Sequence, residues 1–321
     1  MTTVRLKWRR LLALTFALSF TSPANADVNL RIACAVRFAS VDEGAEILGR
    51  KDEFIQRLSA FDRAARMKTD RPISEEEFLK FVQGNVLAWN ESEKAKIEAA
   101  IAGIRPKLDA LSLSLPKIVS FVKTTGAEEG CAFYTRDTAI MMPEKETDEG
   151  DAAQLKKTIA HELFHILTRE NPELREKLYQ SIGFTKCDEV EFPSDLKSRK
   201  ITNPDAPRND HAIRIRIRGE EVHAVPILVS NAAKYDVNRG CEFFNYLQLS
   251  FLAMPRTPTA EPILASPEEI SGFFEQVGRN SSYVIHPEEI LADNFALLIL
   301  DEHNVPSTEI IEKMRSILGQ K

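Results

Sequence analysis

The 321-residue sequence contains only four cysteines and six histidines. No two cysteines stand in a C-x-x-C spacing, which argues against a cysteine-ligated metal site. Beyond residue 26, no apolar run approaches the roughly 20 residues that a membrane-spanning helix needs. Basic residues are outnumbered, 42 against 48 acidic ones, and this balance argues against nucleic acid or an anionic membrane as a partner.

The N-terminus has the order of features that is typical of a secretory signal. Four basic residues between positions 5 and 10 precede an apolar segment at 11–20, and residues 24–26 read A-x-A. We therefore predict a signal peptide over 1–26, a mature chain that begins at Asp27, and a periplasmic or secreted location. The alternative is an uncleaved membrane anchor. Cleavage would leave 38 basic and 48 acidic residues, a net charge of −10 with histidine neutral.

All four cysteines lie after the predicted cleavage site, at Cys34, Cys131, Cys187 and Cys241. An even number of cysteines in an exported chain indicates disulfide bonds. Three pairings are possible, and the sequence does not choose between them. We favour Cys34 with Cys131 and Cys187 with Cys241, because these bonds link each half of the chain separately.

Helical and strand patterns both occur along the mature chain and predict an α+β fold. Apolar spacing and capping signals predict a helical N-terminal lobe over 27–115 without visible chemistry. A catalytic domain over 116–321 would follow, with a small mixed or antiparallel sheet, an inserted hairpin region at about 185–265, and a helical C-terminal part. Within it we expect strands over 117–123, 130–136 and 139–142, a helix over 151–168, a hairpin over 211–218 and 221–230, a helix over 243–253, and a short helix after Ser266.

The most informative stretch is residues 161–165, which match the pattern H-E-x-x-H. On a helix, His161 and His165 lie one turn apart on one face, so both imidazoles can reach a single ion. Glu162 projects about 100° away from His161, where it can act on a metal-bound water without being a ligand. The motif therefore predicts two zinc ligands and a general base. The alternative is a chance match between two core histidines.

Residues 286–295 contain the candidates for a third zinc ligand. Pro287 predicts the first turn of a helix that continues to Leu300. Glu289 and Asp293 lie one turn apart on this helix and share a face. This placement suits Glu289 as the third ligand and Asp293 as the carboxylate that accepts the other ring N–H of a ligating histidine.

Two neighbours of Glu289 are weaker candidates for the same position. His286 has a suitable imidazole, but it precedes the predicted helix. Glu288 has Ala292 one turn later on the helix, so it lacks a supporting carboxylate. We favour Glu289 and keep His286 as the alternative ligand.

The combination of H-E-x-x-H with E-x-x-x-D resembles the gluzincin metallopeptidases, of which the thermolysin-like enzymes are familiar members. The resemblance implies that His161, His165 and Glu289 bind zinc. It also implies that Glu162 is the general base and that Asp293 orients a ligand histidine. About 120 residues separate His165 from Glu289, more than in those enzymes, so an inserted region must fold between the two motif helices.

These features predict an exported zinc peptidase whose partner is a peptide or protein substrate. Zinc would polarise the scissile carbonyl, and Glu162 would pass a proton from the attacking water to the leaving amine. An oxyanion donor is also needed, and Tyr283 is the first candidate because it lies near the Glu289 helix. Two alternatives stay open: a non-catalytic zinc-binding protein of the cell envelope, and a zinc amidase that acts on cell-wall peptides. The remaining oxyanion candidates are Tyr235, His211 and His223.

Overall fold

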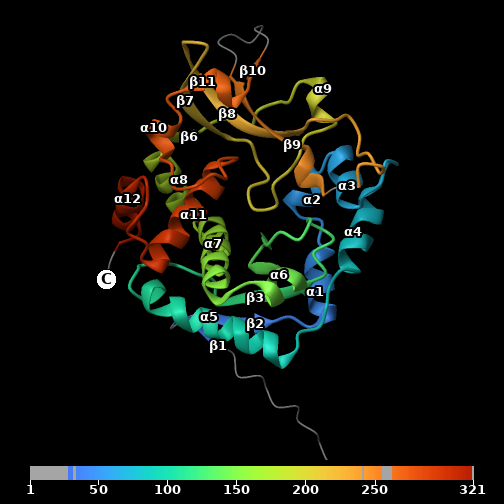
Figure 1. Cartoon of the computed structure of the whole chain (residues 1–321), viewed down its shortest axis with the longest axis vertical. Helices are drawn as coiled ribbons and strands as arrows, with labels where there is room; N and C mark the ends of the chain where they lie inside the picture. The colour runs from blue at the N-terminus through green and yellow to red at the C-terminus, as the bar shows by residue number, and fades with distance from the viewer. Residues whose placement is uncertain (1–27, 32–33, 241, 255–261, 320–321) are drawn as a thin grey trace, which may run out of the picture.

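A five-stranded sheet and a six-stranded sheet lie at opposite ends of the molecule, with helices α7 and α11 between them (Figure 1). The computed structural model describes residues 28–31, 34–240, 242–254 and 262–319, so the predicted signal peptide lies outside the described residues. The predicted α+β class is confirmed. The strands are β1 (Val28–Arg31), β2 (Cys34–Phe38), β3 (Ile118–Thr124), β4 (Tyr134–Arg136), β5 (Ala139–Pro143), β6 (Phe184–Lys186), β7 (His211–Ile217), β8 (Glu220–Ser230), β9 (Leu247–Ala253), β10 (Ile263–Ala265) and β11 (Ile270–Ser271). The helices are α1 (Val41–Leu48), α2 (Glu53–Arg57), α3 (Ala60–Arg66), α4 (Glu75–Gln83), α5 (Glu91–Asp109), α6 (Glu144–Glu149), α7 (Ala152–Glu170), α8 (Pro172–Ser181), α9 (Ser194–Lys197), α10 (Phe274–Val277), α11 (Pro287–Leu300) and α12 (Thr308–Leu318), with short 3₁₀ turns η1 (Phe243–Tyr246) and η2 (Pro267–Glu269).

The five-stranded sheet has the order β1-β2-β3-β5-β4, and its inner strands β3 and β5 carry buried side chains on both faces. Strands β2, β3 and β5 run parallel, and β4 pairs antiparallel with β5 at one edge. Successive side chains of a strand point to opposite faces, so Phe121 packs in the core beside α5 and α7, whereas Val122 packs in a second core beside α1 and α4. The lobe predicted as helical over 27–115 contains α1 to α5, and the strands β1 and β2 at its start join this sheet.

The six-stranded sheet is antiparallel throughout its described pairs and has the order β10-β9-β8-β7-β11, with β6 also paired to β7. The predicted hairpin is confirmed as β7 and β8. Ile213 and Ile215 are buried, while Arg214 and Arg216 between and after them are exposed. All strands of this sheet come from the long part of the chain between the two motif helices, α7 and α11.

Two predicted helices next to this hairpin are wrong. The segment 243–253 forms η1 and then strand β9, whose last four residues are all buried. A short apolar run that is buried on both faces has no period to separate strand from helix. The segment after Ser266 forms η2, strand β11 and only one turn of helix, α10.

The helix that carries H-E-x-x-H is confirmed as α7. Asp151 caps its first turn, with the side chain accepting from the backbone N–H groups of Ala153 and Gln154. α7 packs against α5 on one side and against α11 on another. α11 begins at Pro287 and is buried along most of its length, which is why its sequence reads as a nearly continuous apolar run.

The cysteine prediction fails where the structure tests it. Cys131 and Cys187 carry free thiols, so the predicted bond between Cys34 and Cys131 is absent. Cys34 lies next to the start of β3, and Cys131 lies just beyond its end, where its backbone N–H donates to the Gly126 carbonyl. A seven-residue strand separates such positions by roughly 20 Å, and Cys241 lies outside the described residues.

Across the described part of the chain, no helix combines the length and the apolar character that crossing a membrane requires.

Candidate metal centre

Helices α7 and α11 bring the predicted metal ligands together. His161 and His165 lie on α7 and Glu289 on α11, and one ligand atom from each lies within 4.8 Å of the other two. The contacts show that the helices run in opposite directions. Along α7, His165 follows His161 by one turn. Along α11, the partner of His165, Glu288, comes more than one turn before Asp293, the partner of His161.

Both imidazoles present the same nitrogen to Glu289. His161 Nε2 lies 3.2 Å from Glu289 Oε2, and His165 Nε2 lies 3.7 Å from the same oxygen. The Nδ1–H of His161 donates to Asp293 Oδ1 at 3.0 Å. The Nδ1–H of His165 donates to Glu288 Oε1 at 3.0 Å. Because an ionised carboxylate only accepts, each Nδ1 carries a proton, and a ring in its neutral form therefore presents its Nε2 lone pair to Glu289.

Two lone pairs that face a carboxylate oxygen repel it unless a cation, a proton or a metal ion, lies between them. Tetrahedral zinc with bonds of about 2.1 Å places neighbouring ligand atoms about 3.4 Å apart. The two Nε2–Oε2 distances, 3.2 and 3.7 Å, bracket this value. Two imidazole nitrogens and one carboxylate oxygen also form a ligand set of catalytic zinc sites. The three side chains therefore fit a tetrahedral ion with one position left for a water or a substrate.

The charges of the centre are strongly coupled. Burial lowers the pKa of His161, but hydrogen bonds with Asp293 and Glu289 outweigh it and raise that pKa well above its usual range. Burial also lowers the pKa of His165, yet the charges of Asp205 and Glu289 raise it to about 9. Burial raises the pKa of Glu289, whereas the charge of His165 and the bond with His161 bring it down to about 2. The carboxylates thus favour a positive charge among them.

Glu162 is the member of the motif that has a buried oxygen without a hydrogen-bond partner in the described residues. It is 3 % exposed, and its Oε2 accepts no hydrogen bond there. Burial and then the neighbouring Asp205 carboxylate raise the pKa of Glu162 to about 8. Burying a carboxyl oxygen without a hydrogen-bond partner costs free energy of folding. The position of Glu162 beside the ligands therefore suits a hydrogen bond with a small molecule bound at the centre.

Glu288 holds His165 in place, a role that its spacing in the sequence did not indicate. Its carboxylate is 2 % exposed and accepts from His165 Nδ1, from Thr168 Oγ1 at 2.6 Å, and from the Tyr179 hydroxyl. The absence of an acid one turn later on α11 was the wrong criterion, because the partners of Glu288 lie on α7 and α8. The usable signal was the run of two adjacent acids, since Glu288 and Glu289 contact the two ring nitrogens of His165.

A loop at 202–207 also reaches the centre, and nothing in its sequence indicated this. Asn203 Nδ2 donates to Glu289 Oε1 at 2.6 Å. The Asp205 carboxylate lies with Glu162 and His165 in a second group of ligand-type atoms, all within 4.8 Å of one another. Both loop residues are more than 35 positions from either motif in the chain, so their approach depends on the tertiary fold.

His286, the alternative third ligand, has a structural role. It is the N-cap of α11, and its Nδ1 accepts the backbone N–H of Glu288 at 3.1 Å. Burial and then the charge of His211 lower its pKa to about 4. Among the described residues it belongs to no group of converging ligand atoms, and the geometry therefore favours Glu289 over His286.

Tyr283 lies on the segment that leads into α11 and is 39 % exposed. Partial removal from water, and then the charges of Glu289 and Asp205, raise the pKa of its hydroxyl well above the usual range. Tyr283 is therefore within electrostatic reach of the centre and stays a candidate for the oxyanion donor.

None of the other three oxyanion candidates belongs to the described ligand cluster, although His211 lines the cleft beside His165. Tyr235 packs against Tyr246, with ring centroids 5.4 Å apart, in a separate core. His223 is exposed on β8. His211 is buried between two acids, with Nδ1 2.7 Å from Asp210 Oδ1 and Nε2 3.1 Å from Glu176 Oε1.

A cleft of about 600 Å³ opens beside His165. One wall includes Thr135 and Arg136 of the edge strand β4, and another includes Asp205. Its volume is within the usual range for ligand-binding pockets. The cleft is therefore large enough to receive part of a peptide next to the ligand cluster.

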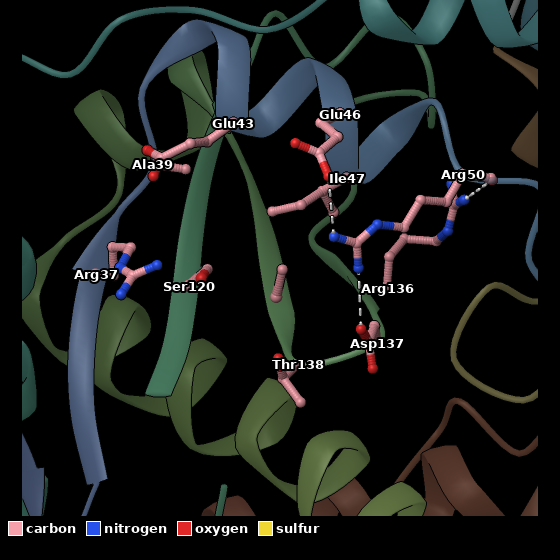
Figure 2. Close-up of a pocket in the computed structure, with 11 residues that line it drawn as sticks. Arg37, Ala39, Glu43, Glu46, Ile47, Arg50, Ser120, Arg136, Asp137 and Thr138 are labelled. Carbon is pink, nitrogen blue, oxygen red and sulfur yellow. Dashed lines mark hydrogen bonds and ion pairs between the residues drawn. The ribbon is translucent and has the colours of Figure 1, made fainter. Parts of the chain in front are cut away.

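Figure 2 shows a smaller pocket of about 250 Å³ beside α1, on the other side of Arg136. Its charged lining is largely paired: Arg50 Nη1 lies 3.2 Å from Asp137 Oδ2, and Arg50 also faces Glu46. The described residues that line it include none of the ligand cluster. We assign this pocket no chemistry.

Comparison of the chain with protein-family models, curated proteins and solved structures found no match. The resemblance to the gluzincins stays a prediction that rests on two motifs. The geometry of the centre therefore carries the functional conclusion.

Proposed function

We propose that this protein is a zinc-dependent peptidase. The observation that carries the proposal is the convergence of two imidazole Nε2 atoms on one oxygen of Glu289, while a carboxylate occupies each Nδ1. This arrangement orients both rings for a metal ion and fixes their tautomer. The proposed exported location rests on residues 1–26 and stays a prediction.

His161, His165 and Glu289 would hold the ion. When bound, zinc would supply a Lewis acid for the scissile carbonyl and a lowered pKa for the attacking water. Asp293 and Glu288 keep the two imidazoles in place. Three protein ligands leave the open position that a catalytic site needs.

Glu162 would be the general base. Its Oε2 is buried without a hydrogen-bond partner, and one of its carboxyl oxygens lies within 4.8 Å of a His165 ring nitrogen. A base must lie within hydrogen-bond reach of the proton that it removes. Glu162 would take a proton from the attacking water and deliver it to the leaving amine. Tyr283 would donate to the oxygen on which negative charge develops.

A peptide substrate would bind along β4, the edge strand next to α7. Arg169 of α7 donates to the Asp137 carbonyl at 2.8 Å and to Thr135 Oγ1 at 2.9 Å, which fixes this edge against the helix. An extended peptide can add to the free edge of a sheet through backbone hydrogen bonds. The cleft beside His165 would then receive a side chain of the substrate.

The test is zinc analysis together with hydrolysis of a mixed peptide library by the wild type and by Glu162→Gln. We expect both proteins to bind about one zinc per chain, because Glu162 is not a ligand. Hydrolysis should fall roughly 10²–10⁴-fold in the variant. Tyr283→Phe should keep zinc and lose part of the activity.

Three outcomes would contradict the proposal. Zinc binding without hydrolysis of any substrate by the wild type would indicate a non-catalytic zinc protein. Hydrolysis confined to cell-wall peptides would indicate an amidase. Failure of the wild type to bind zinc, cobalt or another divalent metal would contradict the metal centre itself.

A further inference from the structure

The loop at 202–207 crosses the centre at the place where the proposed substrate would bind. Asp205 Oδ1 accepts from the Thr135 backbone N–H at 2.7 Å and from the Thr135 hydroxyl at 2.6 Å. β4 pairs with β5 on one side and ends the sheet on the other. The Thr135 N–H therefore points to the free edge, where a peptide that adds to the sheet needs it as a donor.

The same carboxylate also reaches the proposed chemistry. Asp205, Glu162 and His165 each contribute one atom to a group whose members all lie within 4.8 Å. Asp205 thus contacts the edge strand at Thr135 and also lies next to both the proposed general base, Glu162, and the proposed ligand His165. A substrate carbonyl that is bonded to the edge strand and presented for attack must enter this space.

Further contacts hold the loop over the centre. Asn203 donates to Glu289 at 2.6 Å. The Thr202 N–H donates to both carboxylate oxygens of Asp62 at 3.2 Å, and Arg66 donates to the Thr202 carbonyl at 3.1 Å. Asp62 and Arg66 belong to α3 and are almost fully buried. The N-terminal helices therefore fix the position of the loop.

We propose that the loop at 202–207 is a built-in inhibitor whose Asp205 carboxylate occupies the substrate position and must be displaced before hydrolysis. The inference rests on the proposed peptidase function. Its rival assigns Asp205 to catalysis, and the two differ in sign: removal of an inhibitor raises activity, whereas removal of a catalytic group lowers it.

The experiment uses the full chain with cobalt in place of zinc, so that binding at the metal can be followed by visible absorption. Acetohydroxamate, a small chelating probe, is titrated into the wild type, Asp205→Ala and Asp205→Asn. The asparagine variant keeps an oxygen that can accept from Thr135 but removes the charge, and it protects the test if the alanine variant folds poorly. Asp188→Ala is the matched control, because it removes one acidic charge from an exposed position.

We expect Asp205→Ala to bind acetohydroxamate about tenfold more tightly than the wild type, as for a site that is freely open in less than a tenth of the molecules. Asp205→Asn should show a smaller gain in affinity, and Asp188→Ala none. Hydrolysis of the peptide library by the zinc forms should rise in the same order.

Unchanged or weaker probe binding in both Asp205 variants, with cobalt still bound, would overturn the inference and leave the peptidase proposal intact. A fall in hydrolysis in both variants would also overturn it and assign Asp205 to catalysis. If the wild type binds no metal, the proposed function fails, and this inference fails with it.

Discussion

His165 donates its Nδ1–H to Glu288 Oε1 at 3.0 Å, although the neighbouring residue Glu289 faces the Nε2 atom of the same ring. Adjacent residues of one helix thus bind opposite sides of one imidazole. Glu288 is in turn held by Thr168 and Tyr179. The orientation of His165 is therefore set by a buried network that includes three elements, α7, α8 and α11.

This relationship predicts different effects for two neighbouring alanine substitutions. Glu289→Ala removes a ligand and should abolish stable zinc binding. Glu288→Ala leaves the ligands but frees the imidazole, and loss of such a partner weakens metal affinity about 10–100-fold. Competition with a chromophoric zinc chelator measures both affinities. His286→Asn, which keeps a capping side chain, is the control and should bind zinc as the wild type does.

Equal zinc affinity in Glu288→Ala and the wild type would show that His165 does not depend on its buried partner. Loss of zinc in the His286 variant would instead restore His286 as the third ligand.

His286 should make the protein sensitive to acid. Burial and the charge of His211 lower the pKa of His286 to about 4, and its neutral Nδ1 caps α11 by accepting the Glu288 N–H. The unfolded chain takes up the proton near the ordinary pKa of about 6.5, whereas the folded protein resists it until about pH 4. Stability contributed by neutral His286 is therefore complete above pH 6.5 and is lost as the pH falls towards 4. At pH 5 the loss should be roughly 2 kcal/mol.

Urea unfolding of the zinc-loaded wild type and of His286→Asn at pH 7.5 and pH 5 measures this effect. Asparagine caps the helix without titrating, so the variant should lose less stability than the wild type on acidification. Equal losses would contradict the assignment of this acid sensitivity to His286.

Arg66 should be one of the most important charged residues for stability. Its side chain is 1 % exposed and donates to Glu129 at 2.6 and 2.7 Å and to Asp62 at 2.6 Å. Arg66→Ala would leave two buried carboxylates without their partner, and breaking such a pair costs about 3–5 kcal/mol. Thermal and urea unfolding measure the change. Arg71→Ala breaks an exposed pair with Glu77 and should leave the unfolding midpoint nearly unchanged.

A small effect of Arg66→Ala, similar to that of Arg71→Ala, would show that the acids of this cluster are protonated and need no counter-charge. The variant would then still bind zinc as the wild type does.

The parts of the fold that depend on local spacing were predictable. The α7 helix and the β7–β8 hairpin follow from side-chain periodicity and turn residues within a few positions. Strand β9 was not predictable, because its run of buried apolar residues shows neither the alternation of a strand nor the spacing of a helix. The predicted bond between Cys34 and Cys131 failed because cysteine count says nothing about distance, and the length of β3 separates these two residues.

The spacing in the sequence is enough to place two histidines on one helix face and Glu289 and Asp293 on another, because both spacings are one helical turn. That these two faces meet depends on the tertiary fold, since about 120 residues lie between them. The tertiary fold also decided which carboxylate holds which ring and brought Asn203 and Asp205 to the centre. A helix turn is set by neighbours along the chain, whereas the antiparallel packing of α7 on α11 and the path of the loop depend on burial of the whole core.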